Sequence, residues 1–289
     1  EAKGSILESF ASSSTYFTEN KGQFPDEVLF QAHVSVSGAT VYLCRDKLVS
    51  VFTREVNASG ENEHEDIMKD SVTMDRESPE MEVLSVVTRF VNASSTVVVA
   101  GDGLLPHRNN YFMGNDPSKW YVDVPNYQAV LYKNIYPGID LRYYSHQGSL
   151  KYDFIAQPRA DPSLIKLKYE GVENMELTLK GDLEIMTRFN DLFEKQPVIY
   201  QQREESQLEI PGGYEIMEQG VFGFTLQGGY DQTFPLIIDP ELVYSTYLGG
   251  TNSEYGWGVA VDGAGNAIIT GKTSSSDFPM VNPYDGTYN

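Results

Sequence analysis

The chain has 289 residues, 40% of them hydrophobic and 12% aromatic, with 25 Gly and 14 Pro. Its 41 acidic and 21 basic residues give a formal net charge of −20, which argues against nucleic acids and anionic membranes as partners. No stretch approaches the roughly 20 apolar residues of a membrane-spanning helix, so no transmembrane segment is expected.

The first clear pattern is a meander. Residues 1–15 are rich in Ser and predict a tail or an edge strand. Over residues 28–52 apolar and polar side chains alternate, with turns expected at Gly38 and Asp46. This period of two predicts three strands with one buried face. Residues 57–79 are acidic and poor in apolar residues, which predicts a long exposed loop.

Short strands continue along the rest of the chain. They are expected at residues 81–91, 95–101, 127–132, 139–144, 150–155, 165–169, 175–179, 183–187, 197–200, 213–217, 221–226 and 235–238. Strands at a spacing of roughly eight to twelve residues, rich in Tyr and Phe and separated by Gly and Pro, indicate an all-β protein. We therefore expect β-sandwich-like domains of antiparallel strands and no long helix.

The segment "AVDGAGNAIITG", residues 260–271, predicts a hairpin that cannot bury its own apolar face. It lies in a Gly-, Ser- and Tyr-rich stretch whose length fits a propeller repeat of about 40–45 residues. We expect either that the sequence is a fragment of a longer protein or that another chain completes this partial blade. The candidate assembly edge comprises Val259, Val261, Ile268 and Ile269.

These patterns suggest three domains. We expect an N-terminal β-sandwich-like domain at residues 1–103 with an acidic insert at 57–79, because Gly101, Gly103 and Pro106 cluster at its end. A second, aromatic-rich β-domain is expected at 104–240 and a single incomplete propeller-type repeat at 241–289.

Several stretches carry a family resemblance. Residues 239–279, "DPELVYSTYLGGTNSEYGWGVAVDGAGNAIITGKTSSSDFP", resemble the first unit of the SBBP-type β-propeller repeats of bacteria and archaea. Residues 17–46, 110–144 and 150–171 are similar to the uncharacterised all-β domain that usually precedes those repeats. The resemblance implies a large exported or surface-attached protein without assigned catalytic residues. The acidic insert and the single repeat depart from the family pattern.

The residues themselves predict no catalytic site. Cys44 lies in an expected strand without a histidine nearby in sequence, so we expect a structural cysteine. The four histidines have no metal-ligand spacing: His33, His64, His107 and His146. Acidic residues are too frequent for any carboxylate pair to be informative. Neither a Gly-X-Ser-X-Gly elbow nor a phosphate-binding loop is present.

A few segments carry weaker binding signals. Calcium is the only cofactor with a physical case, at Glu61–Asp66 or Asp262–Asn266, where a solvated charge run and an Asx turn are the simpler interpretations. Trp120 and Trp257 are the candidates for stacking on sugars. Tyr121 and the pair Tyr143-Tyr144 are further candidates of the same kind. Two Asn-X-Ser sequons, at Asn57 and Asn92, are candidates for glycosylation.

We therefore expect a non-enzymatic structural protein, extracellular or at the cell surface. It would assemble through sheet edges into an envelope layer, sheath or filament, by self-association or with other envelope proteins. The alternative is an adhesin or polysaccharide-binding module that uses exposed aromatics. A third hypothesis is a secreted hydrolase whose catalytic part lies beyond residue 289.

Overall fold

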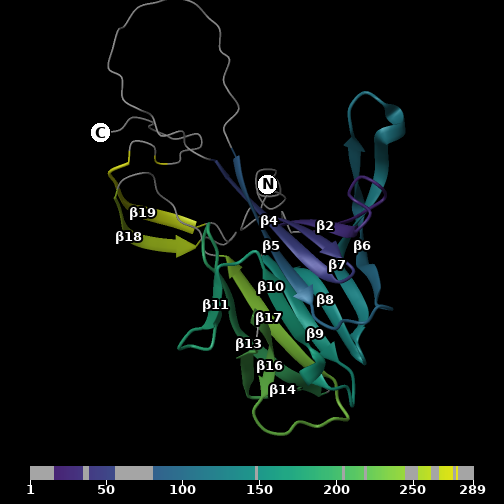
Figure 1. Cartoon of the computed structure of the whole chain (residues 1–289), viewed down its shortest axis with the longest axis vertical. Coiled ribbons are helices and arrows are strands. Elements are labelled where there is room, and N and C mark those ends of the chain that lie inside the picture. The colour runs from purple at the N-terminus through teal and green to yellow at the C-terminus, as the bar shows by residue number, and fades with distance from the viewer. Residues whose placement is uncertain are drawn as a thin grey trace, which may run out of the picture.

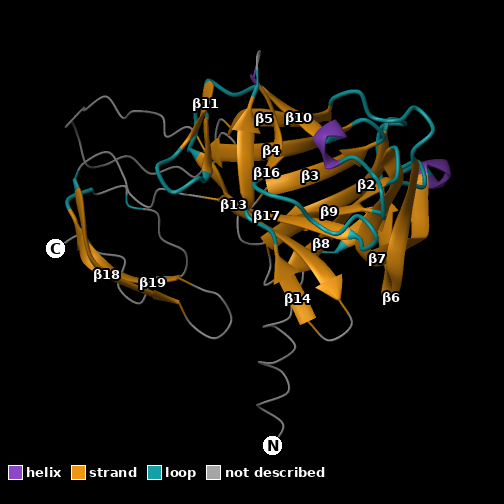
Figure 2. Ribbon diagram, turned by 90° about the horizontal axis from the view of Figure 1, so that it is seen from below, coloured by secondary structure: helices purple, strands orange, loops and turns teal. Residues whose placement is uncertain are grey.

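The computed structural model describes residues 16–34, 39–55, 81–146, 149–203, 206–217, 220–244, 253–261, 267–275 and 278. Within them the chain is almost entirely β-structure, with two single 3₁₀ turns at Pro117–Lys119 and Pro162–Leu164 (Figures 1 and 2). The expected all-β fold class is confirmed. The strands are β1 (Phe17–Glu19), β2 (Val28–Val34), β3 (Ala39–Cys44), β4 (Lys47–Glu55), β5 (Met81–Phe90), β6 (Val98–Phe112), β7 (Trp120–Tyr136), β8 (Ile139–His146), β9 (Ser149–Ala156), β10 (Lys166–Glu170), β11 (Asn174–Leu177), β12 (Leu183–Met186), β13 (Leu192–Arg203), β14 (Ser206–Glu209), β15 (Gly212–Ile216), β16 (Val221–Leu226), β17 (Leu236–Tyr244), β18 (Glu254–Val261) and β19 (Ala267–Thr273).

Alternating side chains explain why these segments are strands. In β9 every second residue is buried, and the intervening polar residues are only partly covered. The buried set is Leu150, Tyr152, Phe154 and Ala156. The predicted meander is present as β2, β3 and β4, which pair antiparallel in sequence order and continue into β5. One face of each strand therefore contributes to the core.

The strands form two layers that are joined on both sides. One layer runs β1–β2–β3–β4–β5–β10–β16–β15, and the other runs β7–β8–β9–β17–β13. The first junction is β1, which pairs with both β2 and β7. At the second, β14 pairs with β13 and β15 pairs with β16, while the amide of Ile210 between them donates to Ile199 O at 2.8 Å. The result is a flattened, closed roll.

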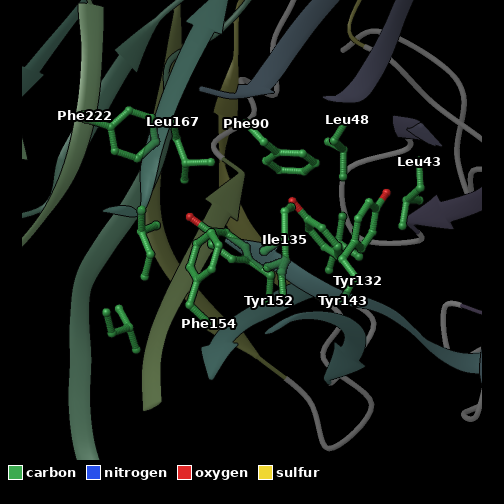
Figure 3. Close-up of a cluster of buried hydrophobic side chains, with 14 of the residues drawn as sticks. Leu43, Leu48, Phe90, Tyr132, Ile135, Tyr143, Tyr152, Phe154, Leu167 and Phe222 are labelled. Carbon is green, nitrogen blue, oxygen red and sulfur yellow. The ribbon is translucent and has the colours of Figure 1, made fainter. Parts of the chain in front are cut away.

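Aromatic side chains fill the space between the layers. Figure 3 shows Leu43, Leu48 and Phe90 on one side and Tyr132 and Tyr143 on the other. The rings of Phe90 and Tyr132 meet edge to face at 5.6 Å although their strands are not paired. The Tyr132 hydroxyl donates to Cys44 O at 2.8 Å, so even a polar atom at this depth has a partner.

The expected boundary between residues 103 and 104 falls inside β6, and the structure does not divide there. Strands before and after that point share one sheet, since β5 pairs with β10 and β1 pairs with β7. They also share one core cluster. The Gly103 φ of +70° and a register shift between Leu104 and Arg108 bend the strand without ending it. The described residues between 17 and 244 therefore form one unit.

Two hairpins extend the architecture. The second half of β6 and the first half of β7 project from the roll as a long hairpin, while the first half of β6 pairs with the second half of β7 (Figure 1). β18 and β19 pair antiparallel as a separate two-stranded sheet. The hairpin expected over residues 260–271 is thus present, although its turn, residues 262–266, lies outside the described residues.

Candidate assembly surfaces and polar clusters

The β18–β19 hairpin carries large apolar side chains that are open to solvent. Tyr255, Trp257, Ile268 and Ile269 are 50 to 72% exposed. Ile268 and Ile269 are consecutive in one strand, so they point to opposite faces of the sheet. The backbones of Val259 and Ile269 pair, as do those of Val261 and Ala267, while the side chains of both valines lie outside the description. Both faces of this small sheet therefore expose apolar surface.

A bulge sets the position of Trp257. Gly256 pairs with Gly271 and Gly258 pairs with Thr270, which leaves Trp257 as the extra residue between them. A Cβ at Gly271 would lie 2.3 Å from the Tyr255 carbonyl oxygen, so the two backbones approach as only glycine permits. The bulge thus presents an indole ring at the surface of the hairpin.

The tip of the β6–β7 hairpin is a second apolar surface. Its exposed large apolar residues are Phe112, Met113, Trp120 and Val122. The rings of Phe112 and Trp120 meet edge to face at 5.2 Å, and Trp120 Nε1 donates to Gly114 O at 3.0 Å. Trp120 is therefore held in one orientation and remains partly exposed.

A polar network anchors the base of this hairpin to the roll. Asn126 is completely buried in β7. Its Oδ1 accepts from the Thr18 hydroxyl of β1 at 2.7 Å, and its Nδ2 donates to His107 O at 3.2 Å. Asn109 Nδ2 donates to the same Thr18 hydroxyl at 3.2 Å. One amide thus links β1, β6 and β7.

Glu194 of β13 is a carboxylate in the interior of the roll, only 1% exposed. It accepts from the hydroxyls of Tyr152 at 2.8 Å and Tyr214 at 3.0 Å, and also from that of Tyr169. Burial raises the pKa of Glu194, while the three tyrosine hydroxyls act to lower it. Its partners come from both layers, so the cluster closes the roll near the β13–β15 junction. A cavity of about 30 Å³ lies beside it, lined by Tyr152, Tyr169 and Glu194 itself.

A second polar cluster lies on the outward side of β8, β9 and β17. Lys151 Nζ is 3.2 Å from Asp239 Oδ1, and the Tyr144 hydroxyl donates to Asp153 Oδ1 at 3.1 Å. Burial and, second, the charge of Asp239 raise the pKa of Asp153 to about 6. Neither this cluster nor Glu194 is among the residues predicted from the sequence. The signal available was the period of two, which places Glu194 on the same face as Leu192.

The remaining predicted residues are dispersed. Cys44 is buried, and burial raises its pKa to about 11, as expected of a structural cysteine. Tyr143 lies in the core, which excludes it from sugar stacking. Asn92 is exposed on a tight turn with φ of 58°. The described residues hold no group of three or more His, Cys, Asp or Glu that could bind a metal ion.

Some predicted residues cannot be placed. His64, the sequon at Asn57 and the calcium candidates Glu61–Asp66 and Asp262–Asn266 lie outside the described ranges. Within the described residues, no helix is long and apolar enough to cross a membrane.

Comparison with known proteins identifies two matches. The family model described as Domain of unknown function (DUF7948) matches residues 17–241, which nearly coincide with the closed roll. The model described as Beta-propeller repeat (SBBP) matches residues 243–279, which contain β18 and β19. The family resemblance inferred from the sequence, an uncharacterised all-β domain followed by an SBBP-type repeat, is thereby confirmed. No curated protein and no solved structure matches the chain.

Proposed function

Because the chain belongs to the family described as Domain of unknown function (DUF7948), whose description assigns no activity, we propose a function from its surfaces. In this proposal the protein acts as a non-enzymatic structural protein of the cell surface or the extracellular space. Its task is assembly, in which the β18–β19 hairpin packs against further β-sheet elements of an envelope layer, sheath or filament.

The observation that carries this proposal is the exposed apolar surface on both faces of β18–β19. A sheet that packs only on its own domain needs one apolar face. A blade of a propeller needs two, because its neighbours cover both faces. Burying most of Tyr255, Trp257, Ile268 and Ile269 contributes on the order of 5 kcal/mol before the costs of association. This free energy favours the stacking of neighbouring sheets on the β18–β19 hairpin.

Self-association of the purified chain tests the proposal. We expect sedimentation velocity to show concentration-dependent association and electron microscopy to show ordered assemblies. Ile268→Glu together with Ile269→Glu places a charge on each face and should abolish the association, because burying an unpaired charge is costly. The matched control is Leu179→Glu, at a fully exposed apolar residue in the turn after β11, which should associate like the unmodified chain. A chain that stays monomeric at every concentration contradicts self-assembly.

Polysaccharide binding is the second candidate. It is favoured by two tryptophans on projecting hairpins, Trp257 in its bulge and Trp120 fixed by its bond to Gly114. Aromatic faces pack well on the apolar side of a sugar ring. Trp120→Ala and Trp257→Ala should then each weaken retention in affinity electrophoresis with polysaccharides. Equal mobility with and without polysaccharide speaks against this function.

Export would make the sequons relevant. Asn92 is exposed on its turn, so a glycan there would meet no steric obstacle from the roll. The intact mass of the natural protein, compared with an Asn92→Gln variant from the same host, tests this modification.

A further inference from the structure

Lys151 and Asp239 form an unusually enclosed ion pair. Their side chains are 14% and 23% exposed, and Nζ lies 3.2 Å from Oδ1. Among the ion pairs of the described residues, this is the only one in which both partners are less than one quarter exposed. Asp239 Oδ1 is shielded from solvent and accepts no hydrogen bond of good geometry from the described residues, despite the nearby amine.

A third residue completes the arrangement. Asp153 is two positions after Lys151 in β9, so both side chains lie on the same face. The register of β17 on β9 pairs Ile238 with Phe154, and its next step places Asp239 beside Asp153. The Tyr144 hydroxyl holds one oxygen of Asp153 at 3.1 Å. An amine, a carboxyl group and a second carboxyl group are thus gathered on adjacent strands.

We propose that Lys151 and Asp239 become joined by an intramolecular isopeptide bond, with Asp153 as the proton-transfer group. Nζ of Lys151 lies 3.2 Å from Oδ1 of Asp239, the oxygen that leaves, so the amine is held next to the carboxyl carbon that it attacks. Reacting atoms about 3–3.5 Å apart form a near-attack arrangement, and this contact brings the two groups close to it. Amide formation between separate molecules is unfavourable in water, but such positioning is equivalent to effective molarities of about 10⁵–10⁸ M. Partial burial also keeps water away from the product.

The bond forms without any external reagent. Lys151 Nζ, after giving up a proton, donates its lone pair to Cγ of Asp239, and the new C–N bond produces a tetrahedral intermediate. The C–Oδ1 bond then breaks. The ammonium supplies two protons to the departing oxygen, which leaves as water, and the amide nitrogen keeps the third. Asp153 carries these protons between nitrogen and oxygen.

The protonation of Asp153 suits this role. Burial is the largest cause and the charge of Asp239 the second, and together they raise the pKa of Asp153 to about 6. The hydrogen bond from Tyr144 and the positive charges of Lys151 and Arg142 lower this pKa. A carboxyl group that both binds and releases protons near neutral pH is an effective general acid and base. Tyr200 faces the same group. Burial raises the pKa of its phenol most, and the charges of Asp153 and Asp239 raise it further.

The position of the bond has a mechanical consequence. β17 is the last strand of the closed roll, and the chain continues from it toward the β-propeller repeat. β17 is held to β9 by hydrogen bonds over only three register pairs. A covalent link from Lys151 to Asp239 would prevent β17 from being pulled away when the repeat is under load. The bond itself does not depend on the proposed assembly function.

Mass spectrometry of the denatured full chain tests the proposal. We expect a mass lower than the sequence mass by about 18 Da, one water molecule. Peptide mapping should then recover a branched peptide that joins the segments around Lys151 and Asp239, which distinguishes this loss from cyclisation of Glu1. Asp239→Asn should lose about 17 Da instead, because ammonia becomes the leaving group.

Three variants provide the controls. Lys151→Arg preserves the ion pair but cannot form the amide, so its branched peptide should disappear. Asp153→Asn should retain the fold, checked by circular dichroism, and lose or greatly slow the cross-link. Lys195→Arg, at a more exposed pair 3.3 Å from Asp182, should leave the cross-link unchanged. A folded, aged chain without the branched peptide overturns the proposal and leaves an ordinary ion pair.

Discussion

Glu194 is an acid in the middle of a hydrophobic core, and its three tyrosine partners explain how it is accommodated. An ionised carboxylate without donors would be prohibitively costly at this depth, whereas hydroxyl groups directed at both oxygens offset part of the desolvation. Desolvation still prevails, because the pKa of Glu194 is raised from its ordinary value of 4.5. The folded protein therefore binds this proton more tightly than the unfolded chain does.

This proton linkage predicts a pH dependence. Because the folded pKa is raised, the contribution of Glu194 is most favourable below 4.5 and declines as the pH rises through the folded value. Glu194→Gln cannot ionise and should not show this decline. Urea unfolding from acidic to neutral pH should give a free-energy difference, variant minus unmodified chain, that increases with pH. The exposed Glu209→Gln is the control and should give a flat difference; a flat difference for Glu194→Gln would contradict the linkage.

Sequence patterns located core residues better than polar partners. Alternation identifies the inward positions of β9, and it also places Glu194 inward beside Leu192. It does not reveal that Tyr152, Tyr169 and Tyr214 from three distant strands converge on that carboxylate. Such convergence depends on which strands become neighbours, and long-range pairing is not encoded in a local period.

The same distinction holds for elements. The meander β2–β4 and most later strands were predicted, because each has several alternating residues. β1 and β14 were missed, since three or four residues give too little alternation to recognise. β6 was expected to end near Gly103, yet bulges allow it to bend and continue to Phe112. The cluster of Gly101, Gly103 and Pro106 therefore marks a bend within β6, whereas the sequence pattern predicts a domain boundary there.

The anchoring of the β6–β7 hairpin gives a prediction for one element. Asn126→Ala would leave the Thr18 hydroxyl and His107 O without this partner at the base of the hairpin. The expected loss of unfolding free energy is about 1–3 kcal/mol, the cost of unsatisfied buried polar groups. Chemical denaturation measures it, and hydrogen exchange should accelerate first in β1 and β6. Asn174→Ala, at an exposed site, should change stability little; equal stabilities of the two variants would contradict the anchoring role.

At the scale of the whole molecule, closure of the roll determines what can fold alone. The layers share strands that are far apart in sequence, such as Phe90 of β5 opposite Leu167 of β10 and Phe17 of β1 opposite Tyr127 of β7. Division between residues 103 and 104 would cut β6 and expose the core on both sides. β18 and β19 lie in a separate sheet, so the roll does not rely on their hydrogen bonds.

This topology predicts the behaviour of fragments. Residues 1–103 and 104–240, produced separately, should each give the poorly dispersed NMR spectrum of an unfolded chain, because each keeps only part of the shared core. Each also loses strand partners across the cut, since β1 pairs with β7 and β5 pairs with β10. Residues 1–244 should instead fold and unfold in one cooperative transition, at a midpoint close to that of the roll in the full chain. The full chain is the reference, measured by calorimetry under the same conditions. A fragment ending at residue 103 that unfolds cooperatively by itself would restore two domains, because its strands would then need no partners from β7 and β10 to bury their apolar face.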